Sequence, residues 1–427
     1  MKKKGWKWGI VLLFTVLFCV QVAGAQTEIK VWSFGSQTAW LEEVAKSFEA
    51  ANTDIKVKVE DYPYQQMHDN LLIAVQTGVG APNLATIEIS QVAKFYRGDK
   101  VNLLDLTSYL EESGYLDKFY ESRLAPFTFH GALYGIPFDL DPAVFFYRSD
   151  IYQENGIDVE NIQTWDEFVD VGLKFKEQGK YVLQLGNGAA STAEWGHFWM
   201  WLIQAGGGVF DEEANVILDN DIAKKILSYY SDAVVKHEIA NTSPQDVGTP
   251  PWWAPYRASQ VVSDFGPDWY VGFLKANVPE QEGLWRAKSL PAWQPGGYTS
   301  STWGGTMLSI VPSNSETDKA ALAFLSYAML ENKDNLVSFY LKTGMIPPRK
   351  DLVDAEVFDA PDSYFGGQTI GRLLLDQAPQ VPSFYLAPTW PEATDLLNRK
   401  VLLGACLGDD PAYLLEEAAN ELRQLGK

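Results

Sequence analysis

Cysteine and histidine are scarce in this chain of 427 residues, which has 2 cysteines and 4 histidines. Thiolate metal sites and disulfide frameworks need more cysteines than this. No two histidines stand four residues apart, so the His-Glu-x-x-His helix of zinc proteases is missing. The glycine motifs of phosphate loops and dinucleotide folds and the Gly-x-Ser-x-Gly elbow of hydrolases are missing too. We therefore expect no metal ion, no cofactor and no enzyme activity.

Basic residues are also few, because 34 Lys and Arg stand against 55 Asp and Glu, which gives a net charge of −21. This acidic balance argues against nucleic acid and against anionic membranes as partners. Beyond the N-terminus no apolar run is long enough to cross a bilayer, which takes about 20 residues. Hydrophobic residues still make up 46 % of the chain, enough for buried cores, and the length favours two domains.

Residues 1–25 have the layout of a secretory signal peptide. Lysines precede an apolar run from Ile10 to Val20, and Ala23-Gly24-Ala25 fits a small-residue cleavage site. The bulky Phe18 directly before Cys19 argues against lipoprotein anchoring. We therefore expect a mature protein that begins at Gln26, is located in the periplasm or another extracytoplasmic space, and is a monomer.

The mature chain opens with strands and helices in alternation. Strand patterns at 28–34, 55–59 and 84–88 are separated by helical patterns at 39–50 and around 67–75. This order is typical of a parallel sheet covered by helices, in which ligands bind beyond the carboxyl ends of the strands. A carboxylate or amide there could instead serve only as a helix cap or a solvated loop end. The candidates for ligand binding in this part are Trp32, Gln37 and Glu88.

The stretch LYGIPFDLDPAVFFYRSD, residues 133–150, predicts a passage from one domain to another. Two apolar strand patterns flank Pro137-Phe138-Asp139-Leu140-Asp141-Pro142, and each proline favours extended backbone before it. Asp139 and Asp141 would then lie at a seam between domains, where small-molecule sites concentrate. They could also be caps or solvated charges. Glycines at 304–305 and prolines near 347 predict two further crossings.

Aromatic residues are the strongest positive signal, with 15 Trp, 20 Tyr and 22 Phe. Many tryptophans fall in polar loops rich in Gly and Pro, where a flat ring can face a ligand. Sugar rings stack on such faces, while their hydroxyls need carboxylate and amide partners. These tryptophans could alternatively close loops onto the core. The candidates for ligand binding in this group are Trp195, Trp252, Trp253, Asp268, Trp269 and Trp303.

Seven stretches in fixed order resemble the extracellular sugar-binding proteins of ABC importers, the family 1 group that includes maltose-binding protein. Asn83 departs from this family pattern, which usually has an Asp at that position, but that Asp is mainly structural. The stretches are VWSF with the following helix, SFEAANTDIKVKV, QTGVGAPNLATIE, LYGIPFDLDPAVFFYRSDIYQENGID followed by TWDEF, DFGPDWYVGFLK, WGGTMLSIVPSNSETDKAALAFLSYAM and TGMIPPRKD.

This resemblance implies an α/β fold of two lobes, each a mostly parallel sheet flanked by helices, with three interlobe crossings. The expected N-terminal lobe comprises 26–140 and 304–345, and the C-terminal lobe 141–303 and 346–427. It also implies a hinge that closes on a mono- or oligosaccharide, which is then delivered to the permease of an ABC importer. In this family the acid of the first crossing commonly binds sugar, and the Trp303-Gly304 strand start commonly lines the cleft.

Two other functions remain open on the sequence alone. Paired loop acids such as Asp139 and Asp141 would also suit a secreted glycoside hydrolase. A receptor of the same fold for a non-sugar solute is the other alternative, although the negative net charge disfavours anionic ligands.

Overall fold

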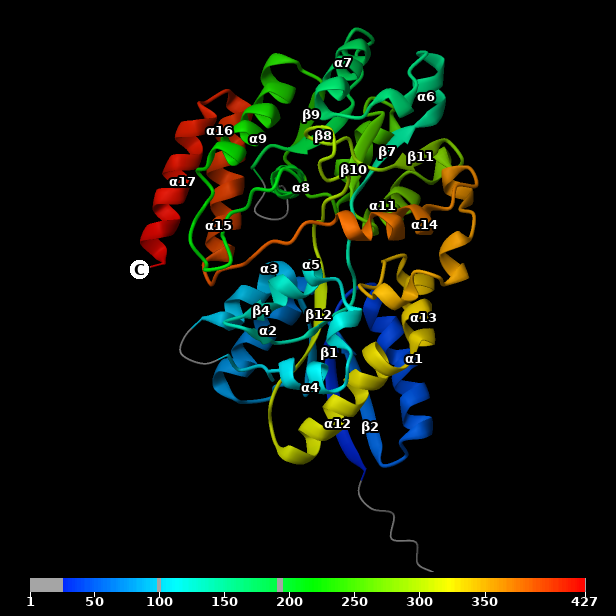
Figure 1. Ribbon diagram of the computed structural model, residues 1–427, viewed down its shortest axis with the longest axis vertical. Coiled ribbons are helices and arrows are strands. Elements are labelled where there is room, and N and C mark those ends of the chain that lie inside the picture. Colours follow the sequence, from blue (N-terminus) through cyan, green and yellow to red (C-terminus); the bar gives the residue numbers. More distant parts are fainter. Residues whose placement is uncertain (1–25, 98–100, 190–194, 427) are drawn as a thin grey trace, which may run out of the picture.

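The computed structural model describes residues 26–97, 101–189 and 195–426, and these residues form two lobes with chain segments passing between them (Figure 1). The signal-peptide prediction falls on residues 1–25, which lie outside the described residues. Each lobe has its own sheet with helices packed on it, so the prediction of a two-lobed α/β fold is confirmed.

The sheet of the first lobe has five strands in the order β2-β1-β3-β12-β6. The central strand β1 (Thr27–Ser33) pairs in parallel with β2 (Ile55–Asp61) and with β3 (Leu84–Glu88), as the strand–helix alternation predicts. The strand β12 (Thr306–Ile310) enters after a crossing and runs antiparallel to β3 and to β6 (Ile136–Pro137). The carboxyl ends of β1 and β3 therefore lie beside the amino end of β12.

Helices cover this sheet because their apolar residues recur on one face. α1 (Ser36–Ala51) buries a face that includes Trp40 and Phe48, and it begins at Ser36 rather than at the predicted residue 39. α2 (Tyr64–Thr77) ends at Gly78, which has a left-handed φ of 68°. The other elements are α3 (Ile89–Val92), η1 (Ala93–Tyr96), α4 (Thr107–Glu112), α5 (Glu121–Leu124), β4 (Thr128–Phe129), β5 (Ala132–Leu133), α12 (Ser315–Ser326) and α13 (Lys333–Thr343).

The sheet of the second lobe is built around β7 (Val144–Arg148), whose residues Phe145 and Phe146 are fully buried, as expected for a strand covered on both faces. β7 runs antiparallel to β10 (Ser263–Gly266) and to β11 (Trp285–Lys288). A parallel pair continues this lobe through β8 (Leu183–Gly186) and β9 (Ala240–Ser243). Strand direction in each lobe is therefore mixed.

Helices α7 (Trp165–Lys176) and α8 (Gly196–Gln204) belong to the second lobe. α7 opens with a capping box between Thr164 and Glu167. α8 is buried along its whole length. The remaining helices are α6 (Ser149–Glu154), α9 (Asp221–Ser231), α10 (Ala254–Arg257), α11 (Trp269–Asn277), α14 (Ile370–Gln377), α15 (Trp390–Leu396), α16 (Leu403–Leu407) and α17 (Pro411–Leu425).

Three crossings join the lobes and lie side by side. The first crossing, residues 138–143, leads from β6 to β7, the second from β11 to β12, and the third from α13 to α14. The backbone N–H of Ala143 donates to the Ser301 carbonyl of the second crossing at 2.9 Å. The N–H of Leu140 donates to the Ile346 carbonyl of the third at 2.8 Å. The prediction of three interlobe crossings is confirmed.

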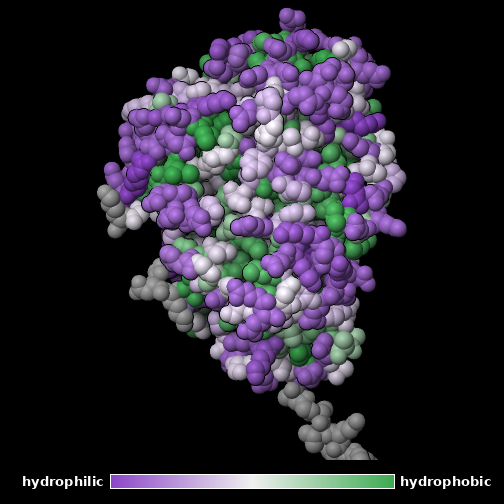
Figure 2. Space-filling view, in the orientation of Figure 1, coloured by the Kyte–Doolittle hydropathy of each residue, from purple (hydrophilic) through white to green (hydrophobic). Residues whose placement is uncertain are grey.

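The surface of the molecule is largely hydrophilic, and apolar atoms show through in the band between the two lobes (Figure 2). Within residues 26–97, 101–189 and 195–426, we find no helix with both the length and the apolar character of a membrane span. In the same ranges no group of three or more His, Cys, Asp and Glu side chains is placed to hold a metal ion.

Candidate binding site

A buried arginine forms hydrogen bonds with both the first and the second crossing. Arg123 lies on the short helix α5 and is 1 % exposed. Its Nε donates to the Asp139 carbonyl, and its Nη1 donates to the Gly304 carbonyl at 3.1 Å. Its Nη2 contacts the carboxylates of both Asp139 and Asp141. Asp139 Oδ1 also accepts from the N–H of Thr306 at 3.0 Å, so one guanidinium and one carboxylate hold both crossings at the start of β12.

A third carboxylate adds the third crossing to this group. Asp268 precedes α11, and its Oδ1 accepts from the N–H of Trp269 at 2.7 Å. Its Oδ2 accepts from the N–H of Ile346, in the third crossing, at 2.6 Å. Asp268 also interacts with the neighbouring carboxyl of Asp141. We call Arg123, Asp139, Asp141 and Asp268 the hinge acid cluster, because together they contact all three crossings.

The charges of the hinge acid cluster do not balance, because three carboxylates share one guanidinium. Burial raises the pKa of Asp141 well above its ordinary value, against the pull of Arg123, and the neighbouring Asp268 adds to the rise. Burial likewise raises the pKa of Asp139, with the Asp141 charge adding to it. Burial raises the pKa of Asp268 to about 7, although the hydrogen bond from Ile346 opposes the shift. All three shifts favour the protonated carboxyl, because burial penalises the charged form and one guanidinium faces three acids.

Gly304 lies close to both the Asp141 carboxylate and the Trp269 indole. Its φ is 99°, and a Cβ built on it would lie 3.1 Å from Trp269 Nε1 and 3.4 Å from Asp141 Oδ2. Trp269 Nε1 donates to the Trp303 carbonyl at 2.9 Å. Asp141, Asp268, Trp269, Trp303 and Gly304 were all predicted as site residues from separate stretches, and the fold places them next to one another.

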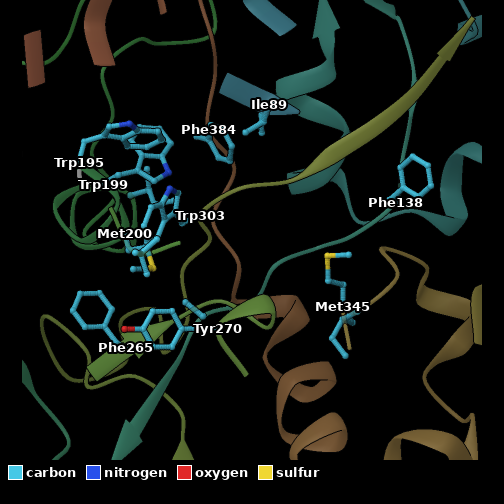
Figure 3. Close-up of a cluster of buried hydrophobic side chains, with 14 of the residues drawn as sticks. Ile89, Phe138, Trp195, Trp199, Met200, Phe265, Tyr270, Trp303, Met345 and Phe384 are labelled. Atoms are coloured by element: carbon cyan, nitrogen blue, oxygen red, sulfur yellow. The ribbon is translucent and has the colours of Figure 1, made fainter. Parts of the chain in front are cut away.

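A group of edge-to-face tryptophans continues from this point into the second lobe (Figure 3). The Trp195 ring lies 6.2 Å from the Trp303 ring and 5.6 Å from the Trp390 ring. The Trp199 ring lies 5.0 Å from both Trp390 and Phe384. We call Trp195, Trp199, Trp303 and Trp390 the tryptophan cluster.

Each ring of the tryptophan cluster is at most 6 % exposed. Sequence reasoning did not select Trp199 or Trp390 as site residues. Trp390 follows Pro388-Thr389 and precedes Pro391, so the criterion of a tryptophan in a proline-rich loop would have found it. The helical residue Trp199 gave no such signal.

Trp252 and Trp253 lie deeper in the second lobe. Trp253 is fully buried, and its Nε1 donates to the Val247 carbonyl at 2.9 Å. Trp252 is 2 % exposed and stacks on His197, with ring centroids 5.9 Å apart. Trp252 reaches the tryptophan cluster only through His197, whose ring lies 5.9 Å from that of Trp303.

Glu88 ends β3 on the first-lobe side, and its side chain caps α3. Its carboxylate accepts from the N–H of Ser90 and from the Tyr64 hydroxyl, each at 2.9 Å. Burial raises the pKa of Glu88, although those hydrogen bonds and the Arg123 charge oppose the rise. Its own N–H donates to His68 Nε2 at 3.1 Å, and burial lowers the pKa of His68 to about 4, so this histidine is a neutral acceptor. In this structure Glu88 therefore caps a helix, which is the alternative to a ligand-binding role.

Trp32 and Gln37 lie farther along the same edge of the first lobe. Trp32 Nε1 donates to the Glu60 carboxylate at 2.9 Å, and its ring lies 5.2 Å from the Tyr62 ring. Gln37 is 5 % exposed and folds back toward Gly35, where a Cβ would lie 3.3 Å from Gln37 Oε1. The structure thus brings neither residue to the hinge acid cluster.

A cavity of about 830 Å³ lies between the lobes beside α15. The first lobe contributes Tyr96, Phe129 and Tyr134 to its wall, and the second lobe contributes residues 387–389 and Glu392. None of the predicted site residues lines this cavity. Those predicted residues that lie at the crossings are therefore separate from the lining of this cavity.

Comparison with known proteins assigns the chain to a family. Residues 32–331 match the family model of the bacterial extracellular solute-binding proteins. The chain is 32 % identical over 384 residues to the arabinooligosaccharide-binding protein of Halalkalibacterium halodurans, which covers 88 % of this chain and 84 % of the relative. It is 30 % identical over 409 residues to the arabinooligosaccharide-binding protein of Bacillus subtilis, which covers 93 % and 92 %.

A solved structure supports the same placement at the level of fold. The ABC transporter associated binding protein from B. animalis subsp. lactis Bl-04, in complex with beta-1,6-galactobiose, superposes with a TM-score of 0.73 at 23 % identity. The match covers 94 % of this chain and 98 % of that chain. These relatives are binding proteins rather than enzymes. From its family match and its relatives, the chain belongs to the bacterial extracellular solute-binding proteins.

Proposed function

We propose that this protein captures a neutral oligosaccharide between its two lobes and delivers it to the membrane permease of an ABC importer. The observation that carries the proposal is the meeting of the hinge acid cluster with the tryptophan cluster around Gly304. Indole faces suit the C–H patches of sugar rings, and carboxylates suit sugar hydroxyls. The names of the two arabinooligosaccharide-binding relatives support the same class of ligand.

The residues proposed to bind the ligand divide into three groups. The central group, which surrounds the crossings, would contact the sugar when the lobes open. Glu88, Trp32 and Gln37 would contact it from the first lobe. Trp252 and Trp253 would support the site from beneath. The central group is Asp139, Asp141, Trp195, Asp268, Trp269, Trp303 and Gly304.

Closure would couple ligand binding to transport. The three crossings lie side by side, so small changes in their backbone angles can swing one lobe against the other. A sugar that contacts both lobes would shift the open–closed equilibrium toward the closed form. We propose lobe boundaries of 26–140 with 304–345 and 141–303 with 346–427. We further propose export by the signal peptide 1–25, a monomeric state and no nucleic-acid partner.

Isothermal titration calorimetry with a panel of neutral oligosaccharides tests this proposal. The panel should include arabino-, galacto- and malto-oligosaccharides, and we expect at least one to bind at one site per chain. Trp269→Phe should weaken binding several-fold, because Trp269 is half-buried beside Asp141 and contacts Trp303. Trp285→Phe, a fully buried change in β11, is the matched control and should leave affinity unchanged. Silence of the folded protein across the panel would refute the proposal.

The same titration separates the two alternative functions. A glycoside hydrolase would release shorter products on prolonged incubation, whereas a receptor returns its ligand intact. Asp139 and Asp141 contact the same buried guanidinium, which gives each a structural role. A non-sugar receptor would bind a solute outside the panel and none within it.

A further inference from the structure

The members of the hinge acid cluster come from both lobes and from the chain between them. Arg123 belongs to α5 of the first lobe, and Asp268 precedes α11 of the second lobe. Asp139 and Asp141 lie between them in the first crossing, and all four side chains are at most 3 % exposed. Rotation of one lobe against the other therefore changes the distances within this cluster.

One buried oxygen of this cluster lacks a hydrogen-bond donor. Asp141 Oδ2 accepts from Arg123, but Asp141 Oδ1 is buried and has no partner. Both oxygens of Asp268 accept backbone N–H groups, from Trp269 and Ile346, so this side chain is held as an acceptor. The carboxyl groups of Asp141 and Asp268 nevertheless lie within hydrogen-bond reach of each other. Two carboxylates cannot form a hydrogen bond, whereas a carboxyl that holds a proton donates to its neighbour.

The other titratable groups around the cluster do not remove its excess of acid. In the part of the chain that the structure describes, Arg123 is the one cation that forms ion pairs with these acids. Glu88, at the end of β3, adds negative charge near Asp139 and raises the pKa of that carboxyl further. Burial raises the pKa of Tyr340 in α13, beside Asp268, to about 12, so this tyrosine is neutral at pH 7. A fully ionised cluster would place like charges together in a buried space, which costs free energy.

We propose that Asp141 and Asp268 share one proton while the lobes are together, and that loss of this proton drives the lobes apart. The structure has the lobes together, because Arg97 of the first lobe pairs with Glu392 of the second. With the proton, Asp141 donates to Asp268 and connects the first crossing to the second lobe. Without the proton, the two adjacent carboxylates repel each other, and a rotation that separates the lobes relieves the repulsion. Acid therefore favours the closed form and base favours the open form.

The size of this effect follows from the difference in proton affinity between the two forms. The shared proton is held by the pair as a whole. Burial raises the pKa of Asp268 to about 7 in the closed form, against the ordinary value of 3.8 for a solvated carboxyl. The closed form gains most below about pH 4, and it loses this advantage as pH rises through 7. Between pH 6 and pH 8 the ratio of closed to open molecules should fall about threefold to tenfold.

Single-molecule fluorescence transfer between labels on the two lobes, measured from pH 6 to pH 8 without sugar, tests the shared proton. The wild-type protein should shift from closed toward open molecules across this range. Asp141→Asn places an amide donor at the position of Oδ1 and keeps a carbonyl for Arg123, so the pair no longer needs a proton. The closed fraction of this variant should not depend on pH, and it should be at least that of wild type at pH 6.

His130 provides the matched control, because it lines the cavity between the lobes and histidines as a class titrate near neutral pH. Its φ of 51° suits asparagine, so His130→Asn should fold and should keep the wild-type pH dependence. A wild-type ratio that stays constant from pH 6 to pH 8 would overturn the inference, and so would an equal pH dependence in Asp141→Asn.

The consequence for sugar capture rests on the proposed function, because tighter closure in acid would hold an enclosed oligosaccharide more firmly. The coupling between lobe movement and the proton does not need a sugar. Failure of the protein to bind any oligosaccharide would therefore refute the proposed function alone. A constant closed fraction in the absence of sugar would refute the shared proton alone.

Discussion

At the scale of single residues, the hinge acid cluster is the feature with the clearest electrostatic signature. Asp141 has a left-handed φ of 51°, is fully buried and contacts Arg123, while its Oδ1 lacks a hydrogen-bond partner. A non-glycine residue in this conformation is strained, although Asp and Asn tolerate it best. The residue therefore combines backbone strain, burial and an incompletely satisfied carboxylate at the point where the chain changes lobes.

The pKa of Asp268, raised to about 7, predicts how stability depends on pH. Between its ordinary pKa of 3.8 and 7, the folded protein binds more protons at this site than the unfolded chain does. The stability that protonated Asp268 adds to the folded state is therefore fully present below about pH 4. It is lost as pH rises through 7.

Asp141→Asn should weaken that pH dependence. The asparagine keeps the left-handed backbone, its carbonyl can accept from Arg123, and its amide can donate to Asp268. Melting temperatures measured between pH 4 and pH 8 should fall less steeply in the variant than in wild type. At pH 7.5 the variant should be as stable as wild type or more so.

Asp351→Asn is the matched control with the opposite sign. Burial works against ionisation of Asp351, but Arg349 at 2.9 Å holds its pKa below the ordinary value. That contribution is present above the unfolded pKa and is lost as pH falls, so this variant should lose stability at neutral pH and approach wild type in acid. Parallel pH profiles for Asp141→Asn and wild type would contradict the charge assignment of the hinge acid cluster.

At the scale of elements, the second crossing contains a glycine at a position where any side chain would be strained. Gly305 has a φ of 122°, and a Cβ built on it would lie 2.5 Å from the guanidinium of Arg123. Arg123 has little room to move, because it also binds the carbonyls of Asp139 and Gly304. The start of β12 thus requires a residue without a side chain.

Gly305→Ala should lower the free energy of unfolding by about 1–3 kcal/mol, the usual cost of a residue held in such a conformation. Chemical denaturation measures this change. Gly272→Ala in α11 is the matched control, because its Cβ would meet open space and alanine favours helices by roughly 1 kcal/mol. If Gly305→Ala were as stable as wild type, the account of a sterically fixed second crossing would be wrong.

The elements also show which parts of the fold a sequence can reveal. The three parallel strands and their helices were predicted because apolar periodicity is local. The antiparallel entry of β12 was not predicted, because its partners β3 and β6 lie far away in the sequence. Arg123 was not predicted for the same reason, because the sequence of the short helix α5 does not indicate contacts with two distant crossings.

The candidate site residues that the fold brings together are those in loops of explicit composition. Trp303, Gly304, Asp268 and Trp269 stand in glycine- and proline-rich turns, and the fold brings them together. The presence of a tryptophan in a loop did not show whether its ring faces the candidate site or the core. Trp253 lies in a similar loop, but its indole donates to the Val247 carbonyl inside the second lobe.

At the scale of the whole molecule, one exposed ion pair joins the lobes opposite the crossings. Arg97 and Glu392 come from different lobes, and their side chains are 45 % and 36 % exposed. A pair this exposed contributes only about 0.2–1 kcal/mol. It can therefore bias closure without preventing the lobes from opening.

Arg97→Ala should shift the open–closed equilibrium toward the open form by up to about fivefold, and it should weaken oligosaccharide binding by a similar factor. Single-molecule fluorescence transfer between labels on the two lobes measures the populations. Arg399→Ala removes a pair with Asp395 inside the second lobe and is the matched control. An unchanged population ratio in Arg97→Ala would show that this pair has no part in closure.

The central claim is that an oligosaccharide binds between the lobes, against the indoles and acids that meet at the crossings. A crystal structure of the protein with the tightest-binding oligosaccharide tests it most directly. We predict sugar density between α3 and α8, with a ring against Trp269 or Trp303 and hydroxyls within hydrogen-bond distance of Asp141 or Glu88. Sugar bound on the outer face of a single lobe, with the tryptophan cluster untouched, would contradict the account.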